Sequence, residues 1–419
     1  MNTQIKTTWR KVKLGDVANV LPGFAFKSSE FKKDGDIPVI KIKNITDDLN
    51  VSMENGEYLD ESALNEKTKK YLISNSDILV AMTGATAGKV GKFRSNKKAL
   101  LNQRVAKISP KNIDANFLWI LLGNKDAINL LYRLADGAAQ PNMSGGQIEN
   151  LEFRIPARIE DQKQIADVLS AYDDLIENNT KRIKILEQIA QAIYKEWFVS
   201  PVNGGNLPNG WKNVALRDAI ESYIGGGWGK EEPDDNYPSP AYVIRGTDIP
   251  NAAMGNISTC PLRYHKPSNL RVRVLQGGDL VFEVSGGSKG QPVGRSLLIT
   301  TNLLGQFKQN VICASFCKLI RPNRSKISPF QLYEQILSWY ENGVIEKYQV
   351  QSTGISNFKF ESFIEEEKIT LPPDGIREKF DHSISPLFDE IYSLGNQNQN
   401  LRQARDLLLP KLVSGEIKV

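Results

Sequence analysis

EDQKQIADVLSAYDDLIENNTKRIKILEQIAQAIYKEWFV, residues 160–199, is the stretch on which the rest of the chain depends. Its apolar side chains recur in alternating steps of four and three residues, which is the heptad pattern of a helix that packs on a partner helix. The pattern therefore predicts one long helix with a buried seam. The seam residues are Ile165, Leu169, Tyr172, Ile176, Asn179, Ile183, Leu186 and Ile193.

A second stripe of the same kind lies at the far end of the chain, within residues 375–419. Its apolar members are Leu387, Ile391, Leu394, Leu401 and Leu408, and Asn398 and Arg405 occupy seam positions. Because a seam needs a partner, we expect the two stripes to pair as antiparallel coiled-coil helices. The first helix would be about 60 Å long. The alternative, that each is an ordinary amphipathic helix packed on its own domain, stays open at this point.

After a linker rich in Gly, Pro and Asn, the sequence begins again. At one constant offset, Trp9, Leu14 and Asp16 match Trp211, Leu216 and Asp218. Later matches, such as Ile108 with Ile320, drift to a larger offset, as loop insertions would cause. The repeat predicts two copies of one unit, each a globular domain followed by a long helix. The expected segments are a first domain at 1–159, the long helix at 160–199, a linker at 200–210, a second domain at 211–374 and the C-terminal helix at 375–419.

The expected fold class is α/β, with two mixed α/β domains joined by two long antiparallel helices in a pseudo-two-fold repeat. In the first domain, Ile37–Ile45 and Asp77–Met82 have the composition of strands. Residues 115–135 have the apolar spacing of one helix.

Bulk composition excludes several classes of protein. No apolar run is long enough to span a bilayer, and the N-terminal residues lack the apolar core of a signal peptide. The odd cysteine count, three, contains no CxxC pair and fits a reducing cytosol. Only two histidines are present, which argues against a histidine-rich metal site. We expect a cytoplasmic protein without a metal site.

Two stretches of the chain lack acidic residues altogether, although the whole chain has a net charge of only +5. One lies between Asp77 and Asp114, the other between Glu283 and Glu334, and each opens with a glycine-rich turn after a strand. Lys and Arg suit phosphate groups, whereas Arg, Asn and Gln hydrogen-bond base edges. Candidate DNA contacts in these acid-free windows are Lys89, Lys92, Arg94, Lys97, Asn102, Gln103, Arg104, Lys289, Arg295, Lys308, Gln309 and Asn310.

Within this set we assign two roles. Lys89, Lys92, Lys289 and Arg295 sit in or beside the glycine turns and are expected to contact phosphates. Gln103, Arg104 and Gln309 are expected to contact bases. The competing interpretation is that each window is an ordinary solvated basic face.

Catalytic motifs are missing. GATAGKV (84–90) has the wrong spacing for a phosphate-binding P-loop, and GGGWG (225–229) is no dinucleotide fingerprint. Neither a methyltransferase tetrapeptide nor a nuclease carboxylate set is present. Cys313 and Cys317 lack the further ligands of a metal site. We therefore expect no catalytic residues and no cofactor on this chain.

Several motifs, in order along the whole chain, resemble the specificity (S) subunit of type I restriction-modification enzymes. They are GFAFKSSEF (23–31), IPVIKIKNI (37–45), MTGATAGKVGK (82–92), AAQPNMSGGQIENLEFRIPARIEDQKQI (138–165) and LRQARDLLLPKLVSGEIKV (401–419). In the second copy, STGISNFKFESF (352–363) is a weaker version of QPNMSGGQIENL (140–151).

The resemblance implies a subunit that is not an enzyme by itself. Two target recognition domains would each recognise one half of a bipartite sequence in double-stranded DNA. The helices would set the length of the spacer between the two half-sites. They would also dock two modification subunits that carry S-adenosylmethionine for adenine N6-methylation. Restriction subunits, with ATP and Mg²⁺, would complete the complex.

Two other functions stay open. A self-sufficient nuclease would require a carboxylate set for a metal ion. A coiled-coil scaffold would be either without DNA affinity or tolerant of DNA sequence.

Overall fold

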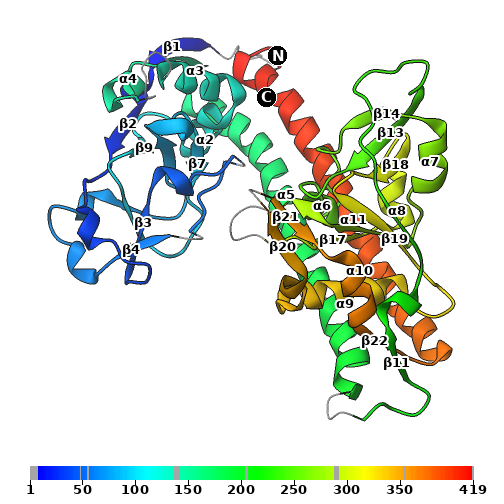
Figure 1. Cartoon of the computed structure of the whole chain (residues 1–419). Coiled ribbons are helices and arrows are strands. Elements are labelled where there is room, and N and C mark those ends of the chain that lie inside the picture. The colour runs from blue at the N-terminus through cyan, green and yellow to red at the C-terminus, as the bar shows by residue number, and fades with distance from the viewer. Residues whose placement is uncertain are drawn as a thin grey trace. The chain divides into compact units, whose positions relative to one another are not determined.

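The computed structural model describes residues 8–47, 49–53, 56–135, 142–202, 206–286, 292–352 and 355–417. The chain divides into two compact units (Figure 1). Unit 1 comprises Met1–Asp174 with Gln403–Val419, and unit 2 comprises Leu175–Arg402. Both units take a part of each long helix, so the five-segment division expected from the sequence stays a prediction.

The described residues of unit 1 form two four-stranded sheets and a separate strand pair. Neighbouring strands of the sheet β2-β9-β6-β7 are all antiparallel. The sheet β4-β3-β8-β5 includes one parallel pair, β3 with β8, and β1 pairs with β10. The strands are β1 (Trp9–Lys13), β2 (Ala18–Pro22), β3 (Ile37–Ile40), β4 (Glu57–Leu59), β5 (Leu72–Ile73), β6 (Ile78–Ala81), β7 (Val90–Lys92), β8 (Ala99–Leu101), β9 (Val105–Pro110) and β10 (Glu152–Pro156).

The shorter α-helices in the described part of unit 1 are α1 (Leu14–Val17), α2 (Ala115–Gly123), α3 (Lys125–Ala135) and α4 (Gly145–Glu149). The Asp114 side chain caps α2 by accepting hydrogen bonds from the amides of Asn116 and Phe117. The apolar face of α2 packs in the unit 1 core, where Phe117, Leu118 and Leu122 are fully buried.

Unit 2 repeats this topology. Its antiparallel sheet β12-β19-β15-β17 corresponds to β2-β9-β6-β7, and in β14-β13-β18 the strands β13 and β18 are parallel, as β3 and β8 are. The strands are β11 (Lys212–Ala215), β12 (Ile220–Gly225), β13 (Ser239–Ile244), β14 (Leu262–His265), β15 (Leu280–Glu283), β16 (Ser285–Gly286), β17 (Ser296–Leu298), β18 (Asn310–Cys313), β19 (Cys317–Pro322), β20 (Gln349–Ser352), β21 (Ile355–Phe358) and β22 (Lys368–Leu371).

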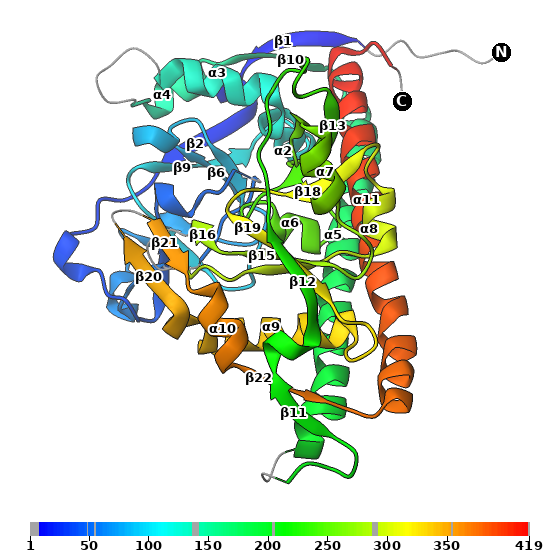
Figure 2. The same cartoon turned by 45° about the vertical axis from the view of Figure 1, so that its right-hand side comes forward.

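One additional small sheet, β16-β21-β20, lies in unit 2, and Figure 2 shows β21 beside β20. The helices of this unit are α6 (Ile249–Ala253), α7 (Pro267–Arg273), α8 (Thr301–Gly305), α9 (Pro329–Glu341) and α10 (Phe360–Glu366).

The internal repeat is confirmed in atomic detail. In unit 1 the Leu14 amide donates to the Leu151 carbonyl, and in unit 2 the Leu216 amide donates to the Glu367 carbonyl, both at 2.8 Å. Leu14 and Leu216 are among the residues that the sequence repeat matched. The strand pair β11–β22 likewise repeats β1–β10.

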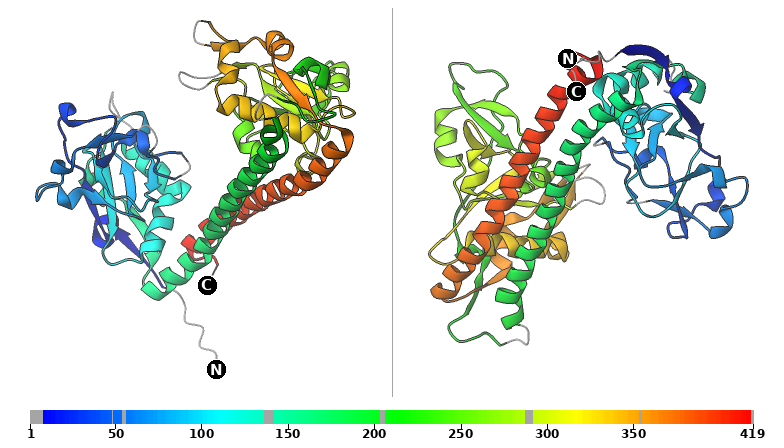
Figure 3. Two further views of the ribbon diagram at one scale, coloured as in Figure 1. Left: turned by 90° about the horizontal axis from the view of Figure 1, so that it is seen from below. Right: turned by 180° about the vertical axis from the view of Figure 1, so that it is seen from behind.

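The two long helices are α5 (Ile159–Tyr194), continued by a π-helical turn at Lys195–Val199, and α11 (Asp374–Ser414). They run side by side within unit 2 (Figure 3). There Asn179 contacts Asn398, Arg182 contacts Glu390, and the Phe198 ring contacts the Phe380 ring. Rising numbers on α5 meet falling numbers on α11, so the helices are antiparallel, as the heptad pattern predicts.

Burial follows the heptad pattern. Seam residues that are buried are Ile165, Leu169, Asn179, Ile183, Ile391, Leu394 and Asn398. Those that are partly buried are Tyr172, Ile176, Leu186, Ile193, Leu387, Leu401, Arg405 and Leu408. Arg405 is held in unit 1 by Asp173, with 2.5 Å between its Nη1 and the carboxylate oxygen.

Two local predictions were wrong in part. The strand expected over 37–45 ends at Ile40, because Asn44 accepts a hydrogen bond from the Lys41 amide and closes a 3₁₀ turn. The single helix expected over 115–135 is broken after Gly123. The Asn124 side chain caps the start of α3 by accepting from the Ala127 amide at 2.9 Å.

Candidate nucleic-acid interface

Each unit presents one tight turn at corresponding ends of two strands. In unit 1 it joins β8 to β9 and consists of Asn102, Gln103 and Arg104. The Met82 amide donates to the Arg104 carbonyl at 2.9 Å, which attaches the turn to the end of β6. Asn102 is buried, whereas the side chains of Gln103 and Arg104 are exposed. The turn therefore exposes a glutamine and an arginine, which are side chains that can hydrogen-bond base edges.

The corresponding turn of unit 2 joins β18 to β19 and consists of Ala314, Ser315 and Phe316. Its Phe316 carbonyl accepts from the Val284 amide at 2.9 Å, as the Arg104 carbonyl does from Met82. The side chain of Phe316 is 59% exposed. The acid-free windows did not single out these residues. The sequence repeat could have identified this turn, because the offset that matches Ile108 with Ile320 also matches Arg104 with Phe316.

A glycine packs closely against the backbone at each turn. An added Cβ on Gly23 would lie 2.3 Å from the Asn102 carbonyl oxygen, and on Gly226 it would lie 2.1 Å from the Cys313 carbonyl oxygen. Both contacts are impossible for another residue, so glycine is required at these positions for the approach of the backbone to the turn.

A polar residue flanks each turn. The amide of Met143 donates to the Met82 carbonyl and that of Phe358 donates to the Val284 carbonyl, both at 2.9 Å. The preceding residues, Asn142 and Asn357, are exposed and therefore occupy equivalent positions. Direct comparison of residues 140–151 with 352–363 misses this equivalence, because the two segments are shifted by three residues.

The basic residues of the first window divide into two groups. Lys89 forms an ion pair with Asp47 at 2.7 Å, an acidic residue from outside the window. Lys92 and Arg94 lie over the ring of Trp119 on α2, at 5.5 and 5.7 Å from its centroid. Lys97, by contrast, is exposed. Lys89, Lys92 and Arg94 are thus held by neighbours of their own unit, and Lys97 extends into solvent.

In the second window, Arg295 is bound to a buried carboxylate. Its Nε and Nη2 donate to the two oxygens of Glu283 at 2.8 and 2.6 Å, and its side chain is only 14% exposed. Lys308, Gln309 and Asn310 are exposed but lie at the start of β18, at the opposite end of that strand from the turn. Lys289 lies outside the described residues.

The acidic residues at or just before the start of the two windows are paired with basic side chains. Asp77 lies 3.7 Å from Lys107, and Asp279 accepts two hydrogen bonds from Arg321, at 2.8 and 2.7 Å. Glu283 is paired with Arg295, as described above. Consequently, these acids do not oppose the approach of a polyanion as free carboxylates would.

Packing within unit 1 explains part of the glycine-rich turn after β6. Gly88 has a φ of +91°, and an added Cβ would lie 2.9 Å from the backbone nitrogen of Tyr132 on α3. The position therefore requires glycine because of α3. In contrast, an added Cβ on Gly84 would meet only Ile42 Cδ1, at 3.6 Å.

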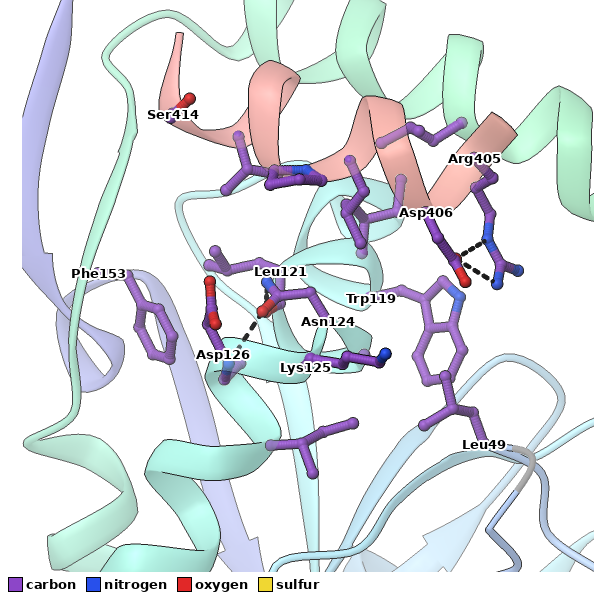
Figure 4. A pocket seen from close by; sticks show the side chains of 18 of the residues that line it. Leu49, Trp119, Leu121, Asn124, Lys125, Asp126, Phe153, Arg405, Asp406 and Ser414 are labelled. Carbon is purple, nitrogen blue, oxygen red and sulfur yellow. Dashed lines mark hydrogen bonds and ion pairs between the residues drawn. The ribbon is translucent and has the colours of Figure 1, made fainter. Parts of the chain in front are cut away.

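A cavity of about 990 Å³ lies in unit 1 between α2, α3 and the last turns of α11 (Figure 4). Asp126, Asp173 and Asp406 line it together with Lys125 and Arg405. In Figure 4, Arg405 is directed toward Asp406, and their closest nitrogen–oxygen distance is 2.8 Å. Because opposite charges are interspersed along the lining, the cavity does not favour a phosphate backbone.

No metal-binding cluster of His, Cys, Asp and Glu occurs among the described residues. Burial raises the pKa of the Cys313 thiol to about 12, so the thiolate that a metal would need is disfavoured there. In the described part of the chain, no helix is both long enough and apolar enough to cross a membrane.

A duplicated α/β domain with two long antiparallel helices and an equivalent exposed turn in each unit defines a two-site recognition protein. The sequence model of the type I restriction modification DNA specificity domain matches residues 6–188. Residues 6–188 therefore belong to this family of DNA specificity domains, and the relatives that match nearly the whole chain are type I restriction enzyme specificity subunits.

Similar proteins cover the whole chain. The type I restriction enzyme MjaIX specificity subunit of Methanocaldococcus jannaschii is 26% identical, over 99% of this chain and 95% of its own. The EcoBI specificity subunit of Escherichia coli is 24% identical over 83% of this chain and 72% of its own. The crystal structure of an S subunit from M. genitalium superposes with a TM-score of 0.56 at 14% identity, covering 98% of each chain, which establishes the shared fold.

Proposed function

We propose that this chain is the non-catalytic DNA sequence-specificity subunit of a type I restriction-modification complex. Each unit recognises one half of a bipartite target in double-stranded DNA. The observation that carries this proposal is that two copies of one fold present the same turn with different exposed side chains. Because Gln103 and Arg104 are replaced by Ser315 and Phe316, the two half-sites differ and the target is asymmetric.

Contacts with the DNA backbone come from the exposed cations of each unit. Lys97 in unit 1 and Lys308 in unit 2 are the members of the original set that extend freely enough to neutralise phosphates. Lys89, Lys92 and Arg94 contribute to the local field while held by their neighbours. Arg295 is excluded from the set, because its guanidinium is bound to Glu283.

The long helices provide the docking surface for two modification subunits. In unit 2, α5 exposes Leu175, Ile185 and Ile189, with exposed fractions of 51, 53 and 42%. At 100° per residue these three lie on one side of the helix, next to the seam. An exposed apolar stripe on a helix is a typical protein-binding surface.

Catalysis belongs to the partner subunits. The modification subunits bind S-adenosylmethionine and methylate adenine N6, whereas the restriction subunits use ATP and Mg²⁺. The complex acts on DNA in the cytoplasm.

The test is methylation of a randomised DNA library by the chain assembled with its modification subunits. The expected result is one asymmetric motif with two short specified halves separated by an unspecified spacer. Methylation without such a motif would contradict the proposal and favour a scaffold that tolerates any DNA sequence.

Two simpler assays address the other classes of function. The purified chain with Mg²⁺ and plasmid should leave the plasmid intact, because a nuclease would cleave it. A gel shift should show DNA binding that weakens steeply with salt. A scaffold without DNA affinity would give no shift even at low salt.

A further inference from the structure

The turns β8–β9 and β18–β19 share one backbone design but carry different side-chain chemistry. In both, the third residue of the turn is anchored by its carbonyl to the strand alongside, and the first donates its amide to the adjacent parallel strand. Asn102 donates to the Ile40 carbonyl at 3.0 Å, and Ala314 donates to the Ile244 carbonyl at 2.8 Å. The turn tips are therefore presented in the same way, and what differs is the side chain at the tip.

The side chain at the third position is Arg104 in unit 1 and Phe316 in unit 2. Single exposed apolar residues are common on protein surfaces, so the exposure of Phe316 alone carries no conclusion. Three features set this one apart. Among Phe, Tyr and Trp it has the most exposed side chain in the described residues, it occupies the position of an arginine in the other copy, and it lies in a segment without acidic residues.

The chain segment that contains this turn carries no acidic residue. The sequence from Val284 to Tyr333 contains no acidic residue. The carboxylate of Glu283, which precedes this stretch, is 2% exposed and bound on both oxygens by Arg295. Beside the turn, the Ser285 hydroxyl donates to Asn357 Oδ1 at 2.8 Å, so these two neighbours of the turn are polar and uncharged.

An arginine distinguishes guanine by bidentate hydrogen bonds to O6 and N7 in the major groove. A phenylalanine cannot hydrogen-bond and instead distinguishes thymine by apolar contact with its C5-methyl group. We infer that the two equivalent turns recognise DNA by different chemistry: Arg104 by hydrogen bonds to a guanine, and Phe316 by contact with a thymine methyl group. This inference rests on the proposed function, since it assumes that both turns face DNA.

The test uses the complete complex with its modification subunits and base analogues in the target found by library methylation. Replacing one thymine at a time by deoxyuridine removes only the methyl group. For the wild-type complex, one such replacement in one half-site should weaken binding roughly fourfold, the factor expected for one buried methyl group. With Phe316→Ala, binding should be weaker and equally strong for thymine and deoxyuridine at that position.

Arg104 is tested in the same way with 7-deazaguanine, which lacks the N7 acceptor. Arg104→Ala should abolish the sensitivity to this analogue at one position, in the half-site that Phe316→Ala does not affect. Val272→Ala serves as the control variant, because Val272 is 50% exposed in unit 2 and lies on α7, outside the turn itself. It should retain the sensitivity to deoxyuridine.

The outcomes separate the inference from the function on which it rests. If the wild-type complex has a specific target but no thymine methyl group matters, or if Phe316→Ala keeps the wild-type sensitivity, the inference is wrong and the function stands. If Phe316→Ala reduces only the binding of the modification subunits, Phe316 is a protein contact and the inference is also wrong. Absence of any specific target would refute the proposed function itself.

Discussion

At the scale of single residues, the seam between α5 and α11 contains a polar pair. Asn179 Nδ2 donates to Asn398 Oδ1 at 3.1 Å, and both side chains are buried. Asn398 Nδ2 lies 3.4 Å from the Thr180 hydroxyl. A buried amide pair is less stabilising than leucine, but it is satisfied in only one register of the two helices. The pair therefore specifies how the helices align.

Replacing one asparagine of this pair should lower the free energy of unfolding more than replacing both. Asn179→Leu leaves the Asn398 amide buried without its partner, which should destabilise the chain by about 1–3 kcal/mol. The double variant Asn179→Leu with Asn398→Leu should recover most of this loss. Urea denaturation measures both effects, and Gln397→Leu, at an exposed position of α11, provides the control. If the double variant is as unstable as the sum of the single ones, the two amides are not coupled.

A second residue-scale feature is the buried carboxyl group of Glu334 on α9, which is 3% exposed. Burial raises its pKa to about 8, and the nearby charges of Glu341 and Glu187 act in the same direction, while Lys195 opposes them. In the unfolded chain a glutamate titrates near its usual pKa of about 4.3. Between these two values the folded state binds a proton that the unfolded state has lost, so stability falls as the pH rises through this window.

Glu334→Gln should remove this pH dependence, because glutamine resembles the protonated carboxyl group. The variant should be more stable than the wild type at pH 7, by at most about 4 kcal/mol, and the difference should shrink toward pH 4.5. Thermal unfolding across this range measures it. Glu378→Gln, which removes an exposed glutamate of α11, shows whether losing one charge elsewhere gives the same profile. Equal profiles for the two variants would contradict the assignment to Glu334.

At the scale of elements, neighbouring residues of α5 have opposite surroundings. Leu186 packs against the core of unit 2, whereas Ile185 is 53% exposed. Leu186→Asp buries an unpaired charge and should destabilise the chain by several kcal/mol, whereas Ile185→Asp should change stability by less than about 0.5 kcal/mol. Thermal denaturation distinguishes them. An unchanged melting temperature for Leu186→Asp would show that the seam is not buried.

Ile185→Asp tests a different property of the same helix. Because the substitution places a charge on the exposed apolar stripe, it should weaken the binding of a modification subunit without unfolding the chain. Copurification of the modification subunit with each variant measures this. Normal assembly would mean that the stripe is not a docking surface.

The elements also show what periodicity can predict. The heptad pattern gave both long helices and their orientation, because a seam is a property of spacing along one segment. Strand composition and apolar spacing in the first domain failed where one side chain ends an element, as Asn44 and Asn124 do, since such capping depends on local geometry. The basic windows located two charged regions but not the exposed turn in unit 2. The distribution of charge along the sequence identifies a region. The exposure of Phe316 depends instead on strand pairing between segments that are distant in the sequence.

At the scale of the whole molecule, the duplication explains why a chain without catalytic residues has a complex fold. A single domain that recognises a few base pairs discriminates poorly in a genome. Two domains multiply their discrimination, because mismatch penalties at separated positions are roughly additive. Since each unit has its own core, its recognition surface can change without disturbing the other.

This independence predicts the result of a domain exchange. In unit 1, the pair β1–β10 and the ends of both long helices share one core, in which Phe153, Leu169 and Leu412 are buried. An exchange should therefore retain β1, β10 and the helices and replace only the residues between β2 and α4, numbers 18–149, with the equivalent segment of a relative. One half of the methylated motif should change, and the other half and the spacer length should stay the same.

The reciprocal exchange in unit 2, over residues 220–366 and with β11 and β22 retained, is the matched control. It should alter the opposite half of the motif, because the two segments are equivalent parts of the repeat. Methylation of the same randomised library by each reconstituted complex measures both results. If either exchange shifts both halves together, the units do not recognise DNA independently, and the acid-free windows are better explained as surfaces that bind the partner subunits. If the spacer changes, the helices do not set it alone, and the recognition domains contribute to the separation of the half-sites.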